Sequence, residues 1–379
     1  MQLNEEQLMI RQTVRELAQN VVAPRAAAID ESEEYPWDIV EMFRRQDIYS
    51  LPFPPEYGGL SGSALTCNVA IEELAKSSAT VALLLAVQAL GGYPLMVAGS
   101  ADQKRRFIPD LASGRKIAAY ALSESNAGSD PAGMTTRAVL QGDEYVLNGS
   151  KMWITNGGVA DVIVVFAKTD MKARSRGVSA LIVERDKVSG LTSSTIHGKL
   201  GIRGSDTAEL HFDNVAVPVE NRIGEEGDGF KIALRVLDRS RPGVAAQALG
   251  VAQGALDYAV GYAKERHQFG KAIAEFQGIQ FMLADMEAQT AAARQLVYWA
   301  SDLIDRHSSE ITHAAAIAKL FAGDTAMRVT TDAVQILGGY GYVREYPVER
   351  MMRDAKITQI YEGTNQVQRV VIARDLLGK

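Results

Sequence analysis

The chain has 379 residues, of which 47% are hydrophobic and 23% charged, and its formal net charge is −6 at pH 7. This composition is that of an ordinary globular protein, and the length exceeds the size at which one core usually stops growing, so two or three domains or distinct layers are expected. Because no long basic run is present, the composition argues against a nucleic-acid-binding protein.

Helical spacing dominates from residue 4 to about residue 110. Asn4 is a good N-cap with acidic residues in the following turn, and it precedes an apolar stripe that Pro24 disturbs. We expect a loop over residues 51–62 and then one long helix over roughly residues 64–90. These patterns predict an N-terminal helical bundle.

The most apolar stretch, residues 81–99, contains glycines and a proline, and it is expected to fall short of a membrane span. The amino terminus is acidic and amphipathic, unlike a signal or transit peptide. We therefore expect a soluble cytoplasmic protein, or a mitochondrial matrix protein if this is the processed form of a eukaryotic chain. The only cysteine, Cys67, lies in an apolar helical pattern that favours a small core residue over a nucleophile.

A second sequence pattern, with period-two alternation and β-branched runs, covers residues 116–223. Within "EYVLNGSKMWITN", Asn148-Gly149 predicts the turn of a β-hairpin. Further strands are expected within residues 161–169, 177–186 and 208–218. The middle of the chain is therefore predicted to form a β-domain.

Helical patterning returns after Gly229, and it is clearest over residues 255–265, 277–306 and 311–337. Helices, then strands, then helices predict an α+β fold. It consists of an N-terminal α-helical domain (1–115), a middle β-domain (116–228) and a C-terminal four-helix bundle (229–379). It is not the alternating βαβ pattern of a Rossmann protein.

The common catalytic fingerprints are missing from the sequence: it has no P-loop, no G-x-G-x-x-G after a strand and no G-x-S-x-G elbow. The five histidines have no metal-type spacing, so no metal site is expected. Trp153 and Thr155 share one face of a predicted strand, where an indole could cover a planar cofactor. Taken alone, a buried tryptophan beside a surface threonine is the simpler interpretation of this pair.

A lone carboxylate, Glu362, stands between Tyr361 and Gly363 in "QIYEGTNQVQR", residues 359–369. An exposed loop glutamate is one interpretation, and a catalytic base is the other. The two are separated by what else the chain contains.

Five separated segments resemble, in order, the signature segments of the acyl-CoA dehydrogenase family of flavoproteins. They are "YALSESNAGSD" (120–130), "KMWITNGG" (151–158), "DRSRPGVAAQALGVAQGALDYAVGYAKERHQFGK" (238–271), "DAVQILGGYGYVREYPVERMMRDAK" (332–356) and the segment around Glu362. The resemblance covers essentially the whole chain. The fold of that family agrees with the order of helical, strand and helical segments predicted above.

The resemblance implies that Glu362 removes a proton from the α-carbon of an acyl-CoA while a hydride passes from the β-carbon to the flavin. Such a base needs a dry site, where its pKa can rise toward that of the substrate. Tyr361 can exclude water there, Gly363 allows a close backbone approach, and Thr364 can cap the last helix. One subgroup of the family carries its base at the position of Ser240, which cannot serve as one.

The resemblance also implies a bound FAD and two sets of contacts. The cofactor contacts are expected at Tyr120, Leu122, Ser123, Ser129, Trp153, Thr155, Arg266, Gln268, Phe269, Gln277, Gln335, Leu337, Gly338, Gly339, Thr364 and Gln366, with residues 335–339 acting from a neighbouring subunit. The substrate contacts are expected at Ser129, Asp238, Arg241, Tyr361 and Gly363. Arg241 could equally form an ion pair with Asp238 three residues away, and both roles can hold at once.

The chain departs from the family pattern at two positions, and the resemblance also implies an assembly and partners. Ser125 and Asn126 stand where the family often has proline and glycine, so the loop near the flavin can differ. The resemblance implies a soluble homotetramer, formed as a dimer of dimers, that acts on an acyl-CoA and passes electrons to electron-transfer flavoprotein, with no nucleic acid and no membrane as partner. Short-to-medium straight acyl chains are preferred, and branched ones stay open. An oxygen-using oxidase and a non-catalytic scaffold of the same fold are the alternatives.

Overall fold

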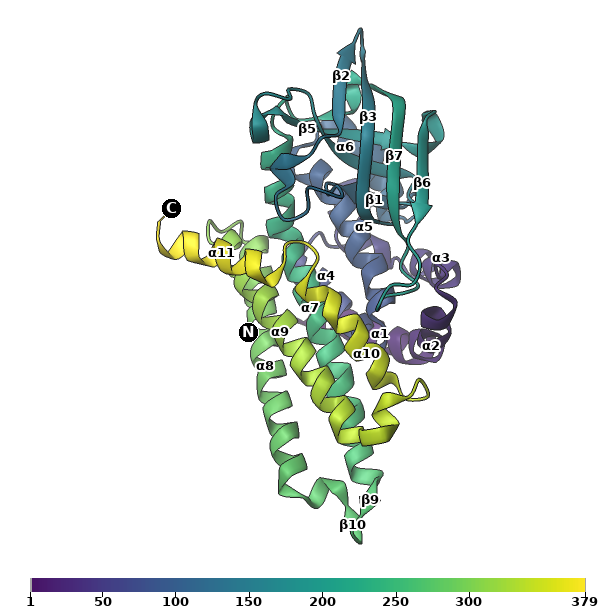
Figure 1. The fold of residues 1–379 in the computed structure, drawn as a ribbon, viewed down its shortest axis with the longest axis vertical. Coiled ribbons are helices and arrows are strands. Elements are labelled where there is room, and N and C mark those ends of the chain that lie inside the picture. The colour runs from purple at the N-terminus through teal and green to yellow at the C-terminus, as the bar shows by residue number, and fades with distance from the viewer. Residues whose placement is uncertain (1, 379) are drawn as a thin grey trace.

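The computed structural model describes residues 2–378, and its helices and strands form the α+β fold that the sequence predicts (Figure 1). The N-terminal helices are α1 (Glu5–Leu17), α2 (Ala23–Ser32), α3 (Trp37–Arg45), α4 (Ala64–Ser77), α5 (Ala79–Ala98) and α6 (Ala101–Ala112). The strands are β1 (Ala118–Ala121), β2 (Arg137–Gln141), β3 (Glu144–Thr155), β4 (Val162–Lys168), β5 (Val178–Glu184), β6 (Leu191–Thr195), β7 (Thr207–Pro218) and β8 (Arg222–Ile223). The C-terminal elements are α7 (Gly229–Glu265), the short pair β9 (His267–Gln268) and β10 (Lys271–Ala272), α8 (Gln277–Asp305), α9 (Ile311–Leu337), α10 (Pro347–Ala355) and α11 (Asn365–Leu376).

The sheet occupies one end of the molecule and the C-terminal helices the other, with α5 and α7 running between them (Figure 1). The strand order is β6-β7-β3-β2-β4-β5-β8, and β1 pairs in parallel with β4. Because β1 ends beside β3 and the helices, the loop that follows β1 lies at the junction of the sheet and the helical layers.

The first helix begins as predicted: the Asn4 side chain accepts from the backbone N–H of Gln7 at 2.8 Å, and Gln7 returns a capping-box bond. Pro24 does not end the helical path. One π-helical turn, Ala18–Val22, joins α1 to α2, and Pro24 lies in the first turn of α2, where its missing N–H costs no hydrogen bond.

The long helix predicted over residues 64–90 is wrong in its bounds, because the chain breaks at Ser78. This residue has an extended φ of −157°, and its hydroxyl accepts from Val81 N at 3.3 Å, so α4 ends there and α5 begins. Helix α5 then continues through Pro94 to Ala98. In the described part of the chain it is the one helix that is long and apolar enough to cross a membrane, whereas the sequence predicted that this stretch falls short of a span. However, 72% of its apolar window is buried inside the protein, as in a core helix.

The hairpin predicted at Asn148-Gly149 is also wrong. Strand β3 runs unbroken through these residues, and the chain turns instead between Gln141 and Glu144, which pair across β2 and β3. Gly149 has a φ of +142° at a register shift against β7, and a Cβ there would lie 2.7 Å from Thr136 Cα. The glycine is needed for a bulge in the strand rather than for a turn.

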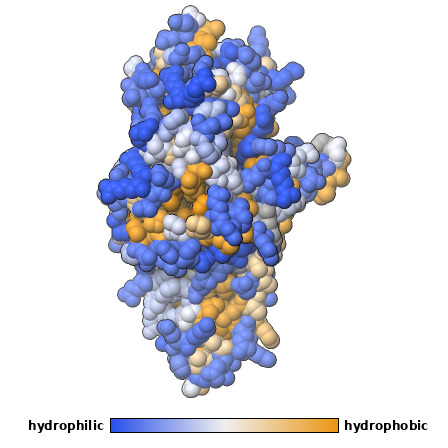
Figure 2. Space-filling model, turned by 180° about the vertical axis from the view of Figure 1, so that it is seen from behind, coloured by the Kyte–Doolittle hydropathy of each residue, from blue (hydrophilic) through white to orange (hydrophobic). Residues whose placement is uncertain are grey.

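Cys67 is buried, as expected, and burial raises the pKa of its thiol to about 12. The back of the molecule shows apolar side chains gathered over its middle and lower parts, within a mostly hydrophilic surface (Figure 2).

Helices α4 and α7 approach each other closely at two glycines of α7. A Cβ on Gly250 would meet Glu72 O at 2.3 Å, and one on Gly254 would meet Lys76 O at 2.2 Å. Both obstacles are backbone atoms, which cannot rotate away as a side chain would.

We expect Gly254→Ala to lower the free energy of unfolding by about 1–3 kcal/mol, because the added methyl group forces α4 and α7 apart. Gly261→Ala is the matched control: it lies on the same helix with nothing within 4 Å of the new Cβ, and its better helix propensity should add up to about 1 kcal/mol. Urea unfolding of both variants measures the difference, and equal stabilities would contradict the close contact.

Candidate active site

Glu362 and Gly363 form a left-handed turn between the end of η10 (Lys356–Gln359) and α11. Their φ angles are +53° and +88°, a conformation that costs a glutamate about 1–3 kcal/mol and persists only where the surrounding structure holds it. Gln368 Nε2 donates to Gly363 O at 2.8 Å and to Glu362 O at 3.3 Å. Thr364 caps α11 as predicted, its hydroxyl accepting from Val367 N at 3.2 Å.

The Glu362 carboxylate points to α7, where the hydroxyl of Ser240 donates a hydrogen bond to its Oε2. Burial raises the pKa of Glu362, against the opposing effects of the Ser240 hydrogen bond and of the charges of Arg241 and Lys319. A carboxylate with a raised pKa and a partly buried position is suited to act as a general base on a weak carbon acid.

Arg241 is 4% exposed and forms the ion pair with Asp238 that the spacing allows, at 2.7 Å. Asp238 also accepts from the Thr312 hydroxyl at 2.6 Å, which fixes its carboxylate between α7 and α9. Within residues 2–378, Arg241 Nε has no hydrogen-bond partner. A buried donor of this kind is costly, so it marks a place where an acceptor from a ligand would be stabilised.

Tyr361 is held from the other side of the turn. Its hydroxyl donates to Gln247 Oε1, and Gln247 Nε2 donates to Ala79 O at 2.8 Å, so the ring is tied to α7 and α5. Burial raises the pKa of Tyr361, which keeps the phenol neutral.

The loop that follows β1 is joined to β3 by Met152 N, which donates to Ser123 O at 2.9 Å. Beneath it, the fully buried Lys151 donates to Leu122 O at 3.0 Å and to Glu124 at 2.9 Å. Burial lowers the pKa of Lys151 to about 8. Burial also works against ionisation of Glu124, but Lys151 and hydrogen bonds from Thr135 and Thr136 outweigh it and lower the pKa of Glu124 to about 2.

Trp153 is 58% exposed and has a φ of +66° at a register shift of β3, and Thr155, two residues further on, is half-buried. The simpler interpretation of a buried tryptophan is therefore wrong. An indole left uncovered beside the β1 loop is free to contact a planar ring. Tyr120 in β1 and Leu122 directly after it are buried, whereas Ser129 and Gln366 are exposed.

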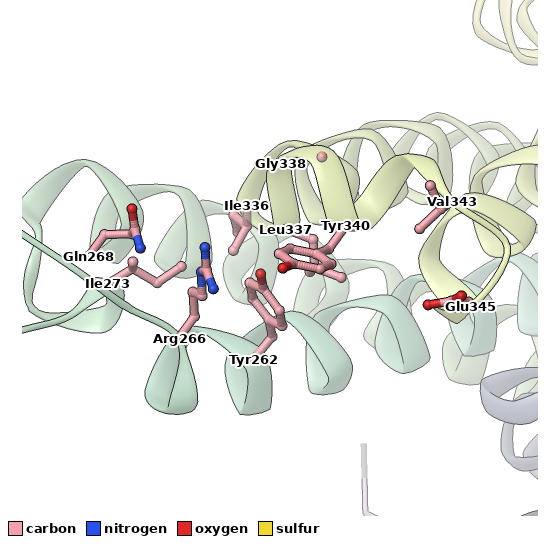
Figure 3. A pocket seen from close by; sticks show the side chains of 11 residues that line it. Tyr262, Arg266, Gln268, Ile273, Ile336, Leu337, Gly338, Tyr340, Val343 and Glu345 are labelled. Carbon is pink, nitrogen blue, oxygen red and sulfur yellow. The ribbon is translucent and has the colours of Figure 1, made fainter.

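A second group of predicted residues lies at the other end of α7, where Arg266 and Gln268 meet the end of α9. With Leu337, Gly338 and Gly339 they line a cavity of about 580 Å³ (Figure 3). The Arg266 guanidinium lies 5.2 Å from the ring centroid of Tyr340 and makes no ion pair in the part of the chain described here. Of the remaining predicted contacts, Phe269 is 93% exposed, and Gln277 and Gln335 are also exposed.

The two groups lie far apart within one chain. Arg241 and Arg266 lie on the same helix about 25 residues apart, which is roughly 37 Å at the rise of an α-helix. The structure therefore brings together the residues within each group but not the two groups.

Several residues that shape the site were not found from the sequence: Ser240 as a donor to the base, Gln247, Gln368, Lys151 and Lys319. The burial of the two lysines could have been predicted from their positions in the sequence. Lys319 is the single charge in the alanine-rich run of residues 314–323, and Lys151 occupies an inward position of an alternating strand. A lysine at a buried position needs partners, and those partners lie near functional loops.

Three family models match the chain: the N-terminal domain of acyl-CoA dehydrogenase over residues 4–115, its middle domain over 119–215 and its C-terminal domain over 227–377. The short-chain-specific acyl-CoA dehydrogenase of Clostridium acetobutylicum is 49% identical, over 98% of this chain and 98% of the relative. The structure of butyryl-CoA dehydrogenase from Megasphaera elsdenii matches with a TM-score of 0.97 and 46% identity, covering 100% and 99% of the two chains. A chain in the structure of the electron transferring flavoprotein of Acidaminococcus fermentans matches with a TM-score of 0.98 and 46% identity, with 100% of both chains covered.

The raised pKa of Glu362 predicts a pH-dependent stability effect. A carboxyl group whose pKa is raised on folding contributes stability that is present below its unfolded-state value of 4.5 and lost as pH rises through the folded-state value. Glu362→Gln, which mimics the neutral acid, should match the parent at about pH 4 and be the more stable protein at about pH 8. Urea unfolding across this range measures the difference. A difference that does not change with pH would contradict the raised pKa.

Proposed function

The chain belongs to the acyl-CoA dehydrogenase family and is an oxidoreductase acting on CH–CH bonds, and from this premise we propose that Glu362 is its catalytic base. The reaction is the α,β-dehydrogenation of a saturated acyl-CoA to the trans-2-enoyl-CoA. The observation that carries the proposal is the half-buried, left-handed turn that presents the Glu362 carboxylate to Ser240 of α7, near the charge of Arg241.

The residues around the turn fit an FAD cofactor. Exposed Trp153 and the backbone of the β1 loop offer a flat apolar face with polar edges, and the cavity at Arg266 offers an uncompensated cation for a diphosphate. When bound, FAD supplies the acceptor for the hydride that leaves the β-carbon. The other contacts proposed are Tyr120, Leu122, Ser123, Ser129, Thr155, Thr364 and Gln366 at the ring end, and Gln268, Phe269, Gln277, Gln335, Leu337, Gly338 and Gly339 at the diphosphate and adenosine end.

The polar groups in and around the turn each have a proposed role in the reaction. The carboxylate of Glu362 takes the α-proton, and burial keeps it basic enough to do so. Arg241 and Asp238 are the proposed contacts of the CoA part, and the Arg241 Nε donor, which has no partner in the described chain, supports this. Tyr361, fixed by Gln247, closes one wall of the site against water.

We place the substrate among short straight-chain acyl-CoA thioesters, since the similar proteins are named as short-chain-specific and butyryl-CoA dehydrogenases. Electron-transfer flavoprotein is the proposed acceptor, supported by the similarity to a chain in the structure of such a flavoprotein. The domain boundaries at residues 115 and 228 and a cytoplasmic location stay predictions.

We further propose that the complete FAD site forms between two copies of the chain, within a homotetramer. The separation of the Glu362 turn from the Arg266 cavity supports this, because a second copy can bring its Arg266 end to the turn of the first. Exposed apolar side chains on the C-terminal helices, among them Phe281, Phe321 and Tyr342, offer surface for such an assembly.

The function is tested by adding acyl-CoA thioesters of increasing chain length to the oxygen-free purified protein. We expect a yellow protein that bleaches fastest with a short straight chain. The bleached protein should regain its colour slowly in air and quickly with an electron-transfer flavoprotein. Rapid recovery in air would indicate an oxidase instead, and a colourless protein that does not take up FAD would indicate a scaffold.

Glu362→Gln should keep FAD and bind acyl-CoA, yet reduce the flavin at least about 10³-fold more slowly, because no other group accepts the α-proton. Stopped-flow absorbance without oxygen measures the rate. Reduction at the parental rate would remove Glu362 from the role of base.

The shared site predicts complementation between two inactive variants. Arg266→Gln should lose FAD affinity, and Glu362→Gln should lose the base, so neither homo-oligomer turns over. In a mixed oligomer, however, the Glu362 of one chain meets the Arg266 of the other, and up to about half of the sites recover. Co-expression with two affinity tags isolates the mixed oligomer. Absence of recovered activity in it would show that both residues act within one chain.

A further inference from the structure

Lys319 is a fully buried lysine on α9 that the scheme above does not use. A lysine in a packed helical interface is rare, because withdrawing its ammonium group from water is costly unless partners compensate. Within residues 2–378 it makes no ion pair with a carboxylate, so neutralising an acidic side chain by direct contact is not its role.

The partners of Lys319 belong to the turn that carries Glu362. Its Nζ donates to Gly363 O at 2.8 Å and to Asn365 Oδ1 at 3.0 Å. Asn365 in turn donates to Leu320 O at 3.2 Å and to Asp324 at 2.8 Å. The turn and the start of α11 are therefore fastened to α9 by one lysine and one asparagine.

The bond to Gly363 O acts where the backbone is left-handed. The carbonyls of Glu362 and Gly363 are held by Gln368 from α11, and Lys319 supplies the bond that reaches Gly363 O from a different helix. The side-chain carboxylate of Glu362, the neighbouring residue, is held by Ser240 from α7. Without Lys319, only contacts from the flanking segment and from the carboxylate itself resist relaxation of the turn.

We propose that Lys319 is a positioning residue for the base: its hydrogen bond to Gly363 O holds the left-handed turn against α9 and so sets where the Glu362 carboxylate lies. This inference rests on the proposed function of Glu362. A misplacement of about 1 Å at a reacting group can cost 10²-fold in rate, which sets the size of the expected effect.

The charge of Lys319 gives the proposal a second readout. The charged groups that face it are Glu362 on the turn, Arg241 on α7 and Asp324 on α9, and Arg369 of α11 pairs with Asp324 at 2.9 Å. Burial lowers the pKa of Lys319 to about 7, with Glu362 opposing that shift. The positive charge of Lys319 in turn lowers the pKa of Glu362, so removing it should move the titration of the base to higher pH.

Lys319→Met tests the proposal, because methionine keeps most of the volume and removes every donor. In the FAD-loaded protein, acyl-CoA affinity should stay within about threefold of the parent, while flavin reduction without oxygen slows by about 10–100-fold. The pH at which the reduction rate is half-maximal should also move upward. Lys319→Gln, with one amide donor on a shorter side chain, should fall between the two.

The controls separate this role from a general loss of stability. Gly254→Ala is destabilised at a contact remote from the turn and should reduce its flavin at the parental rate. If Lys319→Met reduces flavin at the parental rate with the parental pH profile, the positioning role is overturned while Glu362 keeps its own. If both Lys319 variants fail to accumulate as folded yellow protein, the fold itself requires this lysine and the proposal is equally overturned. Full activity of Glu362→Gln would instead overturn the proposed function of Glu362, on which the role of Lys319 rests.

Discussion

A carboxylate withdrawn from water has to be compensated by donors and cations, and Glu362 obtains them from three helices. Ser240 and Arg241 approach it from α7, Lys319 holds its turn from α9, and Gln368 holds the same turn from α11. The left-handed backbone at residues 362 and 363 is affordable only inside this set of bonds. The relative placement of α7, α9 and α11 is therefore a requirement of the site.

The parts of the molecule that could be predicted from the sequence are those in which a local rule acts alone. The Asn4 cap, the Thr364 cap and the order of helical and strand segments follow from residue type and periodicity, and the structure agrees with them. Glu362 stood out because a carboxylate flanked by an aromatic residue and a glycine is unusual, but the left-handed backbone at residues 362 and 363 was not predicted from that pattern.

The failures occurred where a contact distant in sequence overrides the local rule. Asn148-Gly149 is a strong turn signal, but the backbone of Thr136 lies so close to Gly149 that the glycine serves as a bulge within β3. Trp153 appeared to be a core residue by type and is exposed instead, at the point where β3 shifts register between Lys151 and Ile154. The distance between the Arg266 cavity and the Glu362 turn could not be read from the sequence, because it depends on α7 remaining one continuous helix of 37 residues through Pro242.

Helix α5 has a consequence for how the protein is made. Its 20 residues are apolar on nearly every side, and they are covered in the finished molecule by α4, β1 and α7. Helix α7 begins about 130 residues further along the chain, so at ordinary translation speeds α5 leaves the ribosome on the order of ten seconds before its cover exists. During that interval the nascent chain carries a segment as apolar as a membrane helix, and its full burial waits until the second half of the protein has been made.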